Sequence, residues 1–159
     1  MRAQAVDSAL RPEATTPFTL PSPLRALGER LPQWPPSLAL VALLNLALDR
    51  VLPREALEPM LGKVMRVEVA DAGLRLSFRL EREGFRLSLG VLPPDLVVRA
   101  NAADLAALAL RRADPDALFF DRRLVMEGDT ELGLIVKNTL DAADPREALP
   151  GWLTSPNNA

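Results

Sequence analysis

Few residues of this chain have the types and spacing that nucleotide chemistry requires. The segment Gly128-Asp129-Thr130-Glu131-Leu132-Gly133 spaces two glycines as a phosphate-binding loop does. That motif continues with Lys and with Ser or Thr, which reach the phosphates and magnesium, whereas Leu134 and Ile135 follow here. The acidic residues between the glycines would also repel an anion. The sequence therefore argues against a nucleotide site.

Two carboxylate pairs, Asp114/Asp116 and Asp129/Glu131, have the chemistry for acid–base catalysis or for a hard cation. The alternative is that they cap helices or lie in solvated loops. The chain has no His, Cys or Tyr, which removes histidine bases, Ser/His and Cys/His nucleophile pairs and His or Cys zinc sites. We therefore predict a protein that is not an enzyme and that holds no metal or cofactor. An enzyme that uses only carboxylates and arginines is the alternative.

Composition indicates one folded domain. The chain has 159 residues, of which 48% are hydrophobic and 25% charged, and this balance is typical of a globular protein with one core. A net charge of −2, with only five Phe and two Trp, gives no general attraction to nucleic acid. No secretory signal is visible before Pro21, so we expect a cytoplasmic protein without a nucleic-acid partner.

The first 52 residues are predicted to be a leader followed by two helices. Residues 1–21 have few large apolar side chains and read as a disordered leader. Ser22-Pro23 is typical of a helix start, and leucines follow at helical spacing up to Leu31. A Pro-rich elbow that contains Trp34 comes next, so residues 22–35 form an amphipathic helix and an elbow.

A second helix, predicted over 38–52 with a cap at Ser37, is apolar on all sides except at Asn45. Its apolar stretch is shorter than the roughly 20 residues that a spanning helix needs. Such a helix is buried on all sides, or else it contacts lipid, another chain or an apolar ligand. A short helix over 54–61 follows.

Beyond Gly62 the apolar period changes from that of a helix to that of a strand. We predict strands over 65–69, 74–80, 85–91, 96–100 and 123–127, and helices over 101–112, 114–120 and 129–142. Asn101 and Asp104 form a variant of the capping box at the start of one of these helices. The fold class is therefore α+β, with a five-stranded, mainly antiparallel sheet and helices over one face. Residues 144–159 read as a flexible tail.

The two faces of this sheet differ in chemistry. The outward face carries Arg66, Arg75, Arg79 and Arg86, which would meet anionic lipid headgroups or an acidic partner, or else form an ordinary solvated face. The inner face and the helices carry more apolar surface than one sheet face requires. This excess indicates either a cavity for an apolar ligand or a surface for a membrane or an oligomer.

Residues 118–138 (LFFDRRLVMEGDTELGLIVKN) closely resemble the C-terminal signature of the bacterial UbiT proteins. These are ubiquinone biosynthesis accessory factors built on a sterol carrier protein type-two lipid-binding domain. The wider resemblance covers about 36–141 and includes the helix start Asn101–Leu105. It implies a domain over 36–143 in which helices cover one face of a five-stranded sheet and enclose a hydrophobic tunnel.

The resemblance also implies a function. It implies a non-catalytic lipid carrier that holds ubiquinone precursors or phospholipid and supports oxygen-independent ubiquinone synthesis beside iron–sulphur hydroxylase partners. A cytoplasmic protein with peripheral association with the inner membrane is expected. The alternative is a structural interaction module that uses the apolar helix 38–52 as an oligomer or partner interface.

Candidate site residues follow from the same resemblance. Each tunnel candidate has packing in a solid core as its alternative, and the candidates are Val41, Leu44, Leu48, Phe78, Phe119, Phe120, Leu124, Met126, Leu132, Ile135 and Val136. We further hypothesise that residues 22–52 form an amphipathic lid that touches the membrane. Its membrane-contact candidates are Leu24, Leu27, Leu31 and Trp34.

Overall fold

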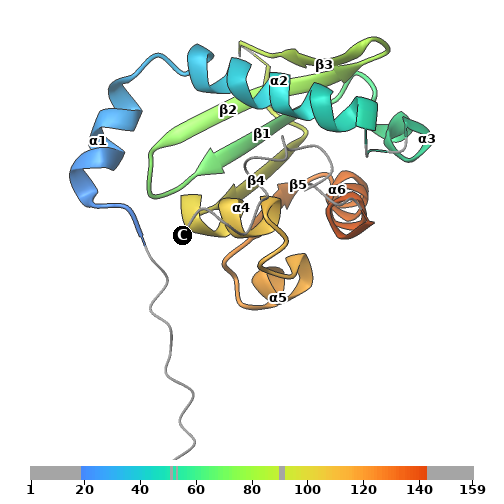
Figure 1. The fold of residues 1–159 in the computed structure, drawn as a ribbon. Helices are drawn as coiled ribbons and strands as arrows, with labels where there is room; N and C mark the ends of the chain where they lie inside the picture. Colours follow the sequence, from blue (N-terminus) through green and yellow to red (C-terminus); the bar gives the residue numbers. More distant parts are fainter. Residues whose placement is uncertain (1–18, 51, 53, 90–91, 143–159) are drawn as a thin grey trace, which may run out of the picture.

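Strands form where apolar and polar residues alternate, and helices form where leucines recur at helical spacing. The computed structural model (Figure 1) describes residues 19–50, 52, 54–89 and 92–142, so most of the expected leader and the whole 144–159 tail lie outside the described residues. The helices are α1 (Ser22–Arg30), α2 (Trp34–Arg50), α3 (Arg54–Leu57), the 3₁₀ helix η1 (Glu58–Met60), α4 (Ala102–Ala109), α5 (Pro115–Phe120) and α6 (Thr130–Ala142). The strands are β1 (Val64–Val69), β2 (Leu74–Glu81), β3 (Gly84–Leu87), β4 (Leu96–Ala100) and β5 (Val125–Gly128).

The five strands form one sheet in the order β3-β2-β1-β4-β5. The pairs β1–β2 and β2–β3 are antiparallel, as predicted, and so is β4–β5, whereas β1 and β4 are parallel. The sheet is therefore mixed, because the chain leaves the edge strand β3, crosses to the other side of β1 and there starts β4 in the same direction as β1.

Short turns connect the first three strands and confirm the predicted meander. Gly73, in the turn between β1 and β2, has a φ of 66°, which a residue with a side chain rarely adopts. Its position matches the turn predicted there. β3 is shorter than predicted, since it ends at Leu87, although Ser88 still donates a backbone hydrogen bond to Ser77 at 3.0 Å.

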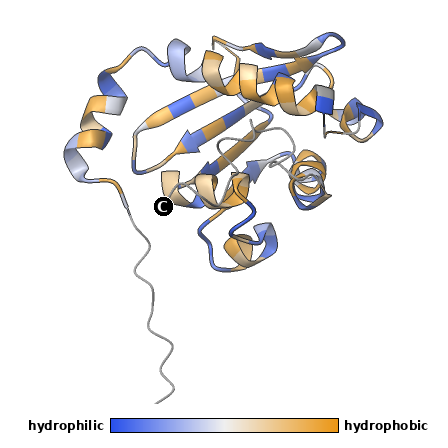
Figure 2. Ribbon diagram, in the orientation of Figure 1, coloured by the Kyte–Doolittle hydropathy of each residue, from blue (hydrophilic) through white to orange (hydrophobic). Residues whose placement is uncertain are grey.

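The inner face of the sheet and the helices that cover it share one hydrophobic cluster. α2 packs against β2 and β3, and α6 packs beside β5. Figure 2 shows that α2 is apolar along its middle part, between a paler first turn and a hydrophilic C-terminal end. Buried members of the cluster include Phe78, Phe85, Leu96, Leu108 and Leu132. The expected arrangement, helices over one sheet face, is confirmed.

Ion pairs organise the outer face. Glu68 accepts from Arg99 at 3.0 Å and lies 4.0 Å from Arg75, while Glu81 contacts Arg79 at 2.6 Å and Arg86 at 3.1 Å. The hydrogen bond from Arg99 to Glu68 raises the pKa of the arginine. Arg66 donates to Ser77 at 3.1 Å. These contacts favour the solvated-face interpretation of the outward arginines over a cationic surface for headgroups.

Two predicted helix caps are wrong. α2 begins at Trp34, three residues before the expected cap Ser37, because prolines are tolerated in the first turn of a helix. Ser37 is buried instead, and its hydroxyl donates to the carbonyl of Gln33 at 2.7 Å. At α4 the cap comes from a distant turn, since the Asp71 carboxylate accepts from the backbone N–H of Ala102 at 2.8 Å.

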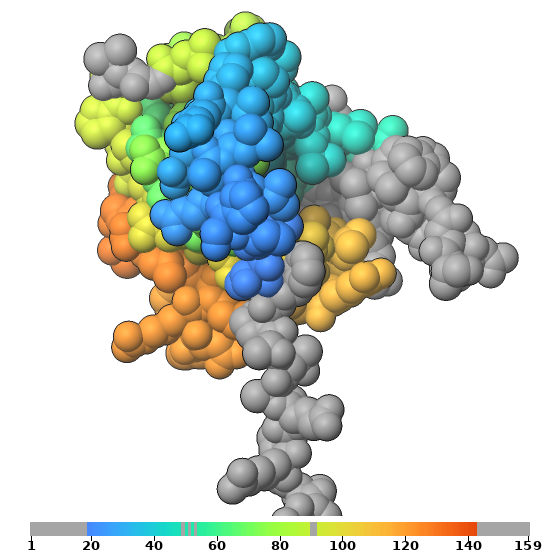
Figure 3. Space-filling model, turned by 90° about the vertical axis from the view of Figure 1, so that its left-hand side faces the viewer, coloured from blue at the N-terminus to red at the C-terminus, as the bar shows by residue number. Residues whose placement is uncertain are grey.

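The helix α1 is held closely on the turn between β1 and β2. A Cβ atom at Gly28 would lie 1.8 Å from the carbonyl oxygen of Ala72, so no larger residue fits there. Gln33 donates to the carbonyl of Gly28 at 2.8 Å and accepts from the N–H of Arg75 at 2.8 Å. Figure 3, which views the molecule from the α1 side, shows that α1 lies on the surface. The close approach at Gly28 and the hydrogen bonds of Gln33 therefore fix the position of α1 relative to the sheet.

We expect Gly28→Val to displace α1 and to lower the free energy of unfolding by about 1–3 kcal/mol, because the added side chain collides with backbone. Urea denaturation measures this loss. Ala26→Val is the matched control, since Ala26 lies on the same helix and is exposed. Equal midpoints for the two variants would contradict a close approach at Gly28.

Candidate functional site

Most of the predicted interior residues do meet in space. Val41, Leu48, Phe78, Leu124 and Leu132 are buried in the hydrophobic cluster. Four more candidates are partly buried against it, and these are Leu44, Met126, Ile135 and Val136. They come from α2, β2, β5 and α6 and from the residue before β5, so several elements contribute to one apolar interior. Whether these residues line a ligand tunnel stays a prediction.

The structure does not place Phe119 and Phe120 in this interior. Their exposed fractions are 44% and 80%, and the two rings contact each other edge-on with centroids 6.1 Å apart. α5 has only six residues, and Leu118 and Pro115 occupy its buried side. The next two positions therefore point outward. The expectation that both phenylalanines face a tunnel is wrong for this conformation.

Two pockets flank α2. One, of about 460 Å³, lies between α2 and β3 and is lined by residues that include Val41, Asn45 and Phe85. The other, of about 270 Å³, lies at the C-terminal end of α2 and has Leu48, Leu57 and Leu80 among its lining residues. Both pockets open to the surface, so neither is an enclosed tunnel.

Asn45, the one polar residue within the apolar part of α2, binds the free edge of the sheet. Its side-chain amide donates to the carbonyl of Phe85 at 2.9 Å, and its oxygen accepts from the N–H of Phe85 at 2.7 Å. A Cβ atom at Gly84 would lie 2.6 Å from that oxygen, so the glycine makes room for the amide. The amide thus occupies backbone groups that an edge strand would otherwise expose.

Replacing Asn45 with Ala is expected to lower the free energy of unfolding by about 1–3 kcal/mol, because partly buried backbone groups of Phe85 lose their partners. Amide hydrogen exchange of Phe85 should rise in the same variant. Ala42→Ser on the exposed side of α2 is the control. Unchanged exchange at Phe85 would show that the amide does not protect this edge.

The segment with two glycines has a structural role. Gly128 lies against the backbone of Asp95, where a Cβ atom would be 2.3 Å from the carbonyl oxygen, and Gly133 faces Leu96 and Met126. Asp129 caps α6 by accepting from the N–H groups of Glu131 at 3.0 Å and Leu132 at 3.2 Å. The glycine spacing therefore reflects close packing between β5, α6 and β4.

The other predicted carboxylate pair also serves a helix. Asp114 accepts from the N–H of Asp116 at 2.9 Å at the start of α5. Asp116 contacts the Lys137 ammonium at 2.7 Å and raises its pKa, which links α5 to α6. Within the described ranges, no group of three or more acidic side chains is placed to hold a metal ion. One member of each pair, Asp114 and Asp129, is therefore a helix cap, as the capping interpretation predicts.

One carboxylate is almost fully buried. Asp104 in α4 has an exposed fraction of 2% and forms an ion pair with Arg123, which follows α5. The sequence predicted Asp104 as part of a capping box, and the structure shows that it reaches a different element instead. This pair connects α4 to the chain just before β5.

Several large apolar side chains of α1, the elbow and α2 are exposed. The predicted membrane-contact residues have exposed fractions of 44% for Leu24, 54% for Leu27, 49% for Leu31 and 52% for Trp34. Leu38 and Leu43 of α2 are also exposed, although the sequence did not predict them as membrane-contact residues. We call five of these residues, Leu24, Leu27, Leu31, Trp34 and Leu38, the α1–α2 apolar face, because Leu43 lies on another side of α2 from Trp34 and Leu38. From Leu31 to Leu48 the chain carries no charged residue.

Among the described residues, no single helix combines the length and the apolar character that spanning requires. α1 and the part of α2 up to Leu48 meet these criteria only together, and they are bent by 93° at the elbow.

A family model described as the SCP-2 sterol transfer family matches residues 44–141. The chain belongs to this family. The match begins within α2 and ends within α6, so the matched region contains the whole sheet and most of the apolar interior, while Val41 of the hydrophobic cluster lies just before it. The exposed helix α1 and the elbow precede it. The resemblance inferred from the residues is thereby confirmed.

The chain is also similar to two individual proteins of ubiquinone synthesis. Over 126 residues the chain is 38% identical to the ubiquinone biosynthesis accessory factor UbiT of Escherichia coli strain K12. The matched region covers 74% of this chain and 72% of UbiT. A solved structure described as a UbiJ-SCP2 ubiquinone synthesis protein has 27% identity and a TM-score of 0.57, and covers 69% of this chain and 97% of its own.

Proposed function

We propose that this protein is a non-catalytic accessory factor of ubiquinone biosynthesis that holds a lipid in its SCP-2 domain. The observation that carries the proposal is the 38% identity to UbiT over 74% of the chain. The ligand would be a prenylated quinone precursor or a phospholipid, presented to biosynthetic enzymes. Both ligand classes have long apolar chains, which suit an interior lined by leucine, valine and phenylalanine side chains.

The pockets beside α2 support this proposal. Each opens at the surface and reaches residues of the hydrophobic cluster, namely Val41 and Phe85 in one and Leu48, Leu57 and Leu80 in the other. A lipid chain that entered either pocket would therefore meet apolar side chains at once. Because Leu48 and its neighbours are buried in the packed cluster, a chain that enters farther than the open pocket requires side chains such as Leu48 to move.

The α1–α2 apolar face would bring the protein to the inner membrane as a peripheral protein. Leucines and a tryptophan on the outer side of a bent helix pair are typical of helices that lie in the membrane interface. Because α1 is held on the turn between β1 and β2, we propose a fixed contact surface in place of a mobile lid. From that position a soluble domain can exchange lipid with the bilayer.

In this reading the protein acts in the oxygen-independent pathway and presents its lipid to iron–sulphur hydroxylases. The resemblance to UbiT is the support for both statements. Two of the carboxylates predicted as candidate catalysts, Asp114 and Asp129, serve as helix caps, and Asp116 pairs with Lys137, which is consistent with a carrier role.

Mass spectrometry of bound lipid tests the function directly. The full chain is purified under mild conditions from a quinone-producing bacterium, extracted with organic solvent and analysed. We expect a polyprenyl phenol, a quinone or a phospholipid in near-stoichiometric amount. An empty extract from folded, monodisperse protein would contradict the carrier function.

The alternative, an interaction module without ligand, makes a different prediction. If the apolar helix served as an oligomer interface, the outward residues Leu38 and Leu43 would form it, because Leu44 and Leu48 face the interior. Sedimentation of Leu38→Glu and of the parent chain distinguishes the interaction module from the lipid carrier. A mass that falls in the variant, together with an empty extract, would favour the module.

A further inference from the structure

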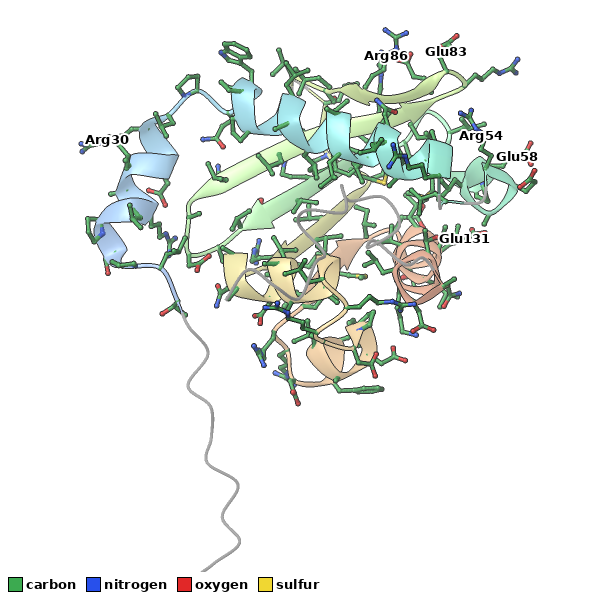
Figure 4. The ribbon with its side chains drawn as sticks, viewed as in Figure 1. Arg30, Arg54, Glu58, Glu83, Arg86 and Glu131 are labelled. Atoms are coloured by element: carbon green, nitrogen blue, oxygen red, sulfur yellow. The ribbon has the colours of Figure 1, made fainter. Side chains whose placement is uncertain are left out.

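The pocket between α2 and β3 lies where the free edge of the sheet meets an apolar side of a helix. Its volume of about 460 Å³ is in the range of small-molecule sites. Val41 and Phe85 are its buried apolar walls, with exposed fractions of 7% and 5%. Glu83 and Arg86 also line the pocket, and Figure 4 shows that their side chains point away from α2. These two charged groups therefore lie at its outer rim.

α2 and β3 run in opposite directions along this pocket (Figure 1). Asn45 on α2 binds the backbone of Phe85 on β3. One turn earlier on the helix is Val41, and two residues later on the strand is Leu87. A helical turn and two strand residues both span about 5 to 7 Å. Val41 therefore lies opposite Leu87, and both residues line the pocket.

The backbone of Leu87 offers a donor and an acceptor at the free edge of the sheet. In an antiparallel pair, the N–H and C=O groups of successive residues point alternately toward the partner strand and away from it. Ser88 donates to Ser77 on β2 at 3.0 Å, so the groups of Phe85 and Leu87 point away from β2. Asn45 binds both groups of Phe85, whereas no group of the described residues binds those of Leu87.

The contact between Asn45 and Phe85 indicates which chemistry fits the groups of Leu87. A single amide satisfies the C=O of Phe85 at 2.9 Å and its N–H at 2.7 Å. Val41 cannot do the same for Leu87, because its side chain is apolar. A ligand hydroxyl can, since it donates and accepts at one atom. A carbonyl or an ether only accepts, and would leave the C=O of Leu87 without a donor.

We infer that this pocket binds the phenol headgroup of a prenylated quinone precursor, with its hydroxyl on the backbone groups of Leu87 and its prenyl chain against Val41 and Phe85. The inference rests on the proposed lipid-binding function. It predicts that a phenol binds more tightly than the corresponding quinone, because a quinone ring carries only acceptors. Leu38 and Trp34 continue the same side of α2 beyond Val41, so the pocket adjoins the α1–α2 apolar face.

The test compares ligands that differ in one donor. The phenol is ortho-farnesylphenol, and its methyl ether keeps the ring, the chain and the oxygen but cannot donate. A second ligand without a donor, farnesyl-para-benzoquinone, controls for the bulk of the methyl group. Isothermal titration calorimetry with the full chain gives each affinity. We expect the phenol to bind about fivefold more tightly than either other ligand, which is the effect of one neutral hydrogen bond.

Hydrogen exchange locates the headgroup. Exchange of the backbone amides is followed by NMR for the full chain with and without the phenol. We expect the phenol to slow exchange at Leu87, because its hydroxyl accepts from that N–H. The amides of β5, the other edge strand of the sheet, are the control and should exchange at the same rate in both samples.

Val41→Asn makes the test specific to this pocket. The introduced amide lies opposite Leu87 as Asn45 lies opposite Phe85, so it occupies the groups that the phenol needs. We expect the preference for the phenol over its ether to vanish in this variant. Ala42→Asn is the matched control, because it introduces the same amide at the next, exposed position of α2 and should keep the preference.

The outcomes separate this inference from the proposed function. Equal affinities for the three ligands, or unchanged exchange at Leu87, would overturn the headgroup site and leave lipid binding intact. So would the same loss of preference in Val41→Asn and Ala42→Asn. If Val41→Asn does not fold, exchange at Leu87 in the parent chain decides. Binding of none of the three ligands would also overturn the inference, and mass spectrometry of the extracted lipid then decides the proposed function independently.

Discussion

Replacing Trp34 and Leu38 together with glutamate is expected to weaken binding to phospholipid vesicles by about thirtyfold or more. Each side chain is about half exposed, at 52% and 50%, so its insertion into the interface buries further apolar area worth about 1 kcal/mol. Glutamate has to stay in water and loses this contribution. Co-sedimentation with vesicles of phosphatidylethanolamine and phosphatidylglycerol over a lipid titration measures the change.

A matched control for this variant comes from the other side of the fold. Phe120 in α5 is 80% exposed, which makes Phe120→Glu an equally drastic change at a surface away from α1 and α2 (Figure 1). We expect Phe120→Glu to leave vesicle binding unchanged. Equal losses in the two proteins, or full binding by the double variant, would show that the α1–α2 apolar face does not contact the membrane.

Replacing Arg123 with Met is expected to lower the free energy of unfolding by about 2–4 kcal/mol, because Asp104 then keeps a buried charge without its partner. The arginine side chain is 42% exposed, which places the loss toward the lower part of this range. The melting temperature should fall by roughly 5–15 °C for a chain of this size. Urea denaturation and a thermal melt at the same pH measure both quantities.

Two further variants isolate the ion pair. Arg122→Met changes the neighbouring exposed arginine and should cost less than about 0.5 kcal/mol. In Asp104→Asn combined with Arg123→Met the buried charge is gone, so the double variant should be more stable than the sum of the single losses predicts. Strictly additive losses would show that the two side chains do not stabilise the fold through each other.

The sequence predicted the strands and the family because both depend on local patterns. Leu76, Phe78 and Leu80 alternate with polar residues, and this period of two places them on the inner face whatever the strand pairs with. The sequence of residues 118–138 was sufficient to predict the family, and the SCP-2 family model confirmed that prediction. The lack of His and Cys likewise follows from composition alone.

Helix ends and surface positions were predicted less well. The start of α2 at Trp34 was missed because consecutive prolines suggest a break, although the first turn of a helix needs no N–H partners. Phe119 and Phe120 look like core residues by type. Their exposure results from the short length of α5, in which Leu118 already occupies the inward position.

By itself the sequence determined an α+β domain with an apolar interior, an apolar second helix and no residues for the common forms of catalysis. Only the tertiary structure decided that β1 and β4 are parallel, that Asn45 binds the edge at Phe85, and that Asp104 pairs with Arg123. Periodicity reports the side of an element on which a residue lies. It carries no information about which distant residue lies opposite, because that depends on how the whole chain packs around one core.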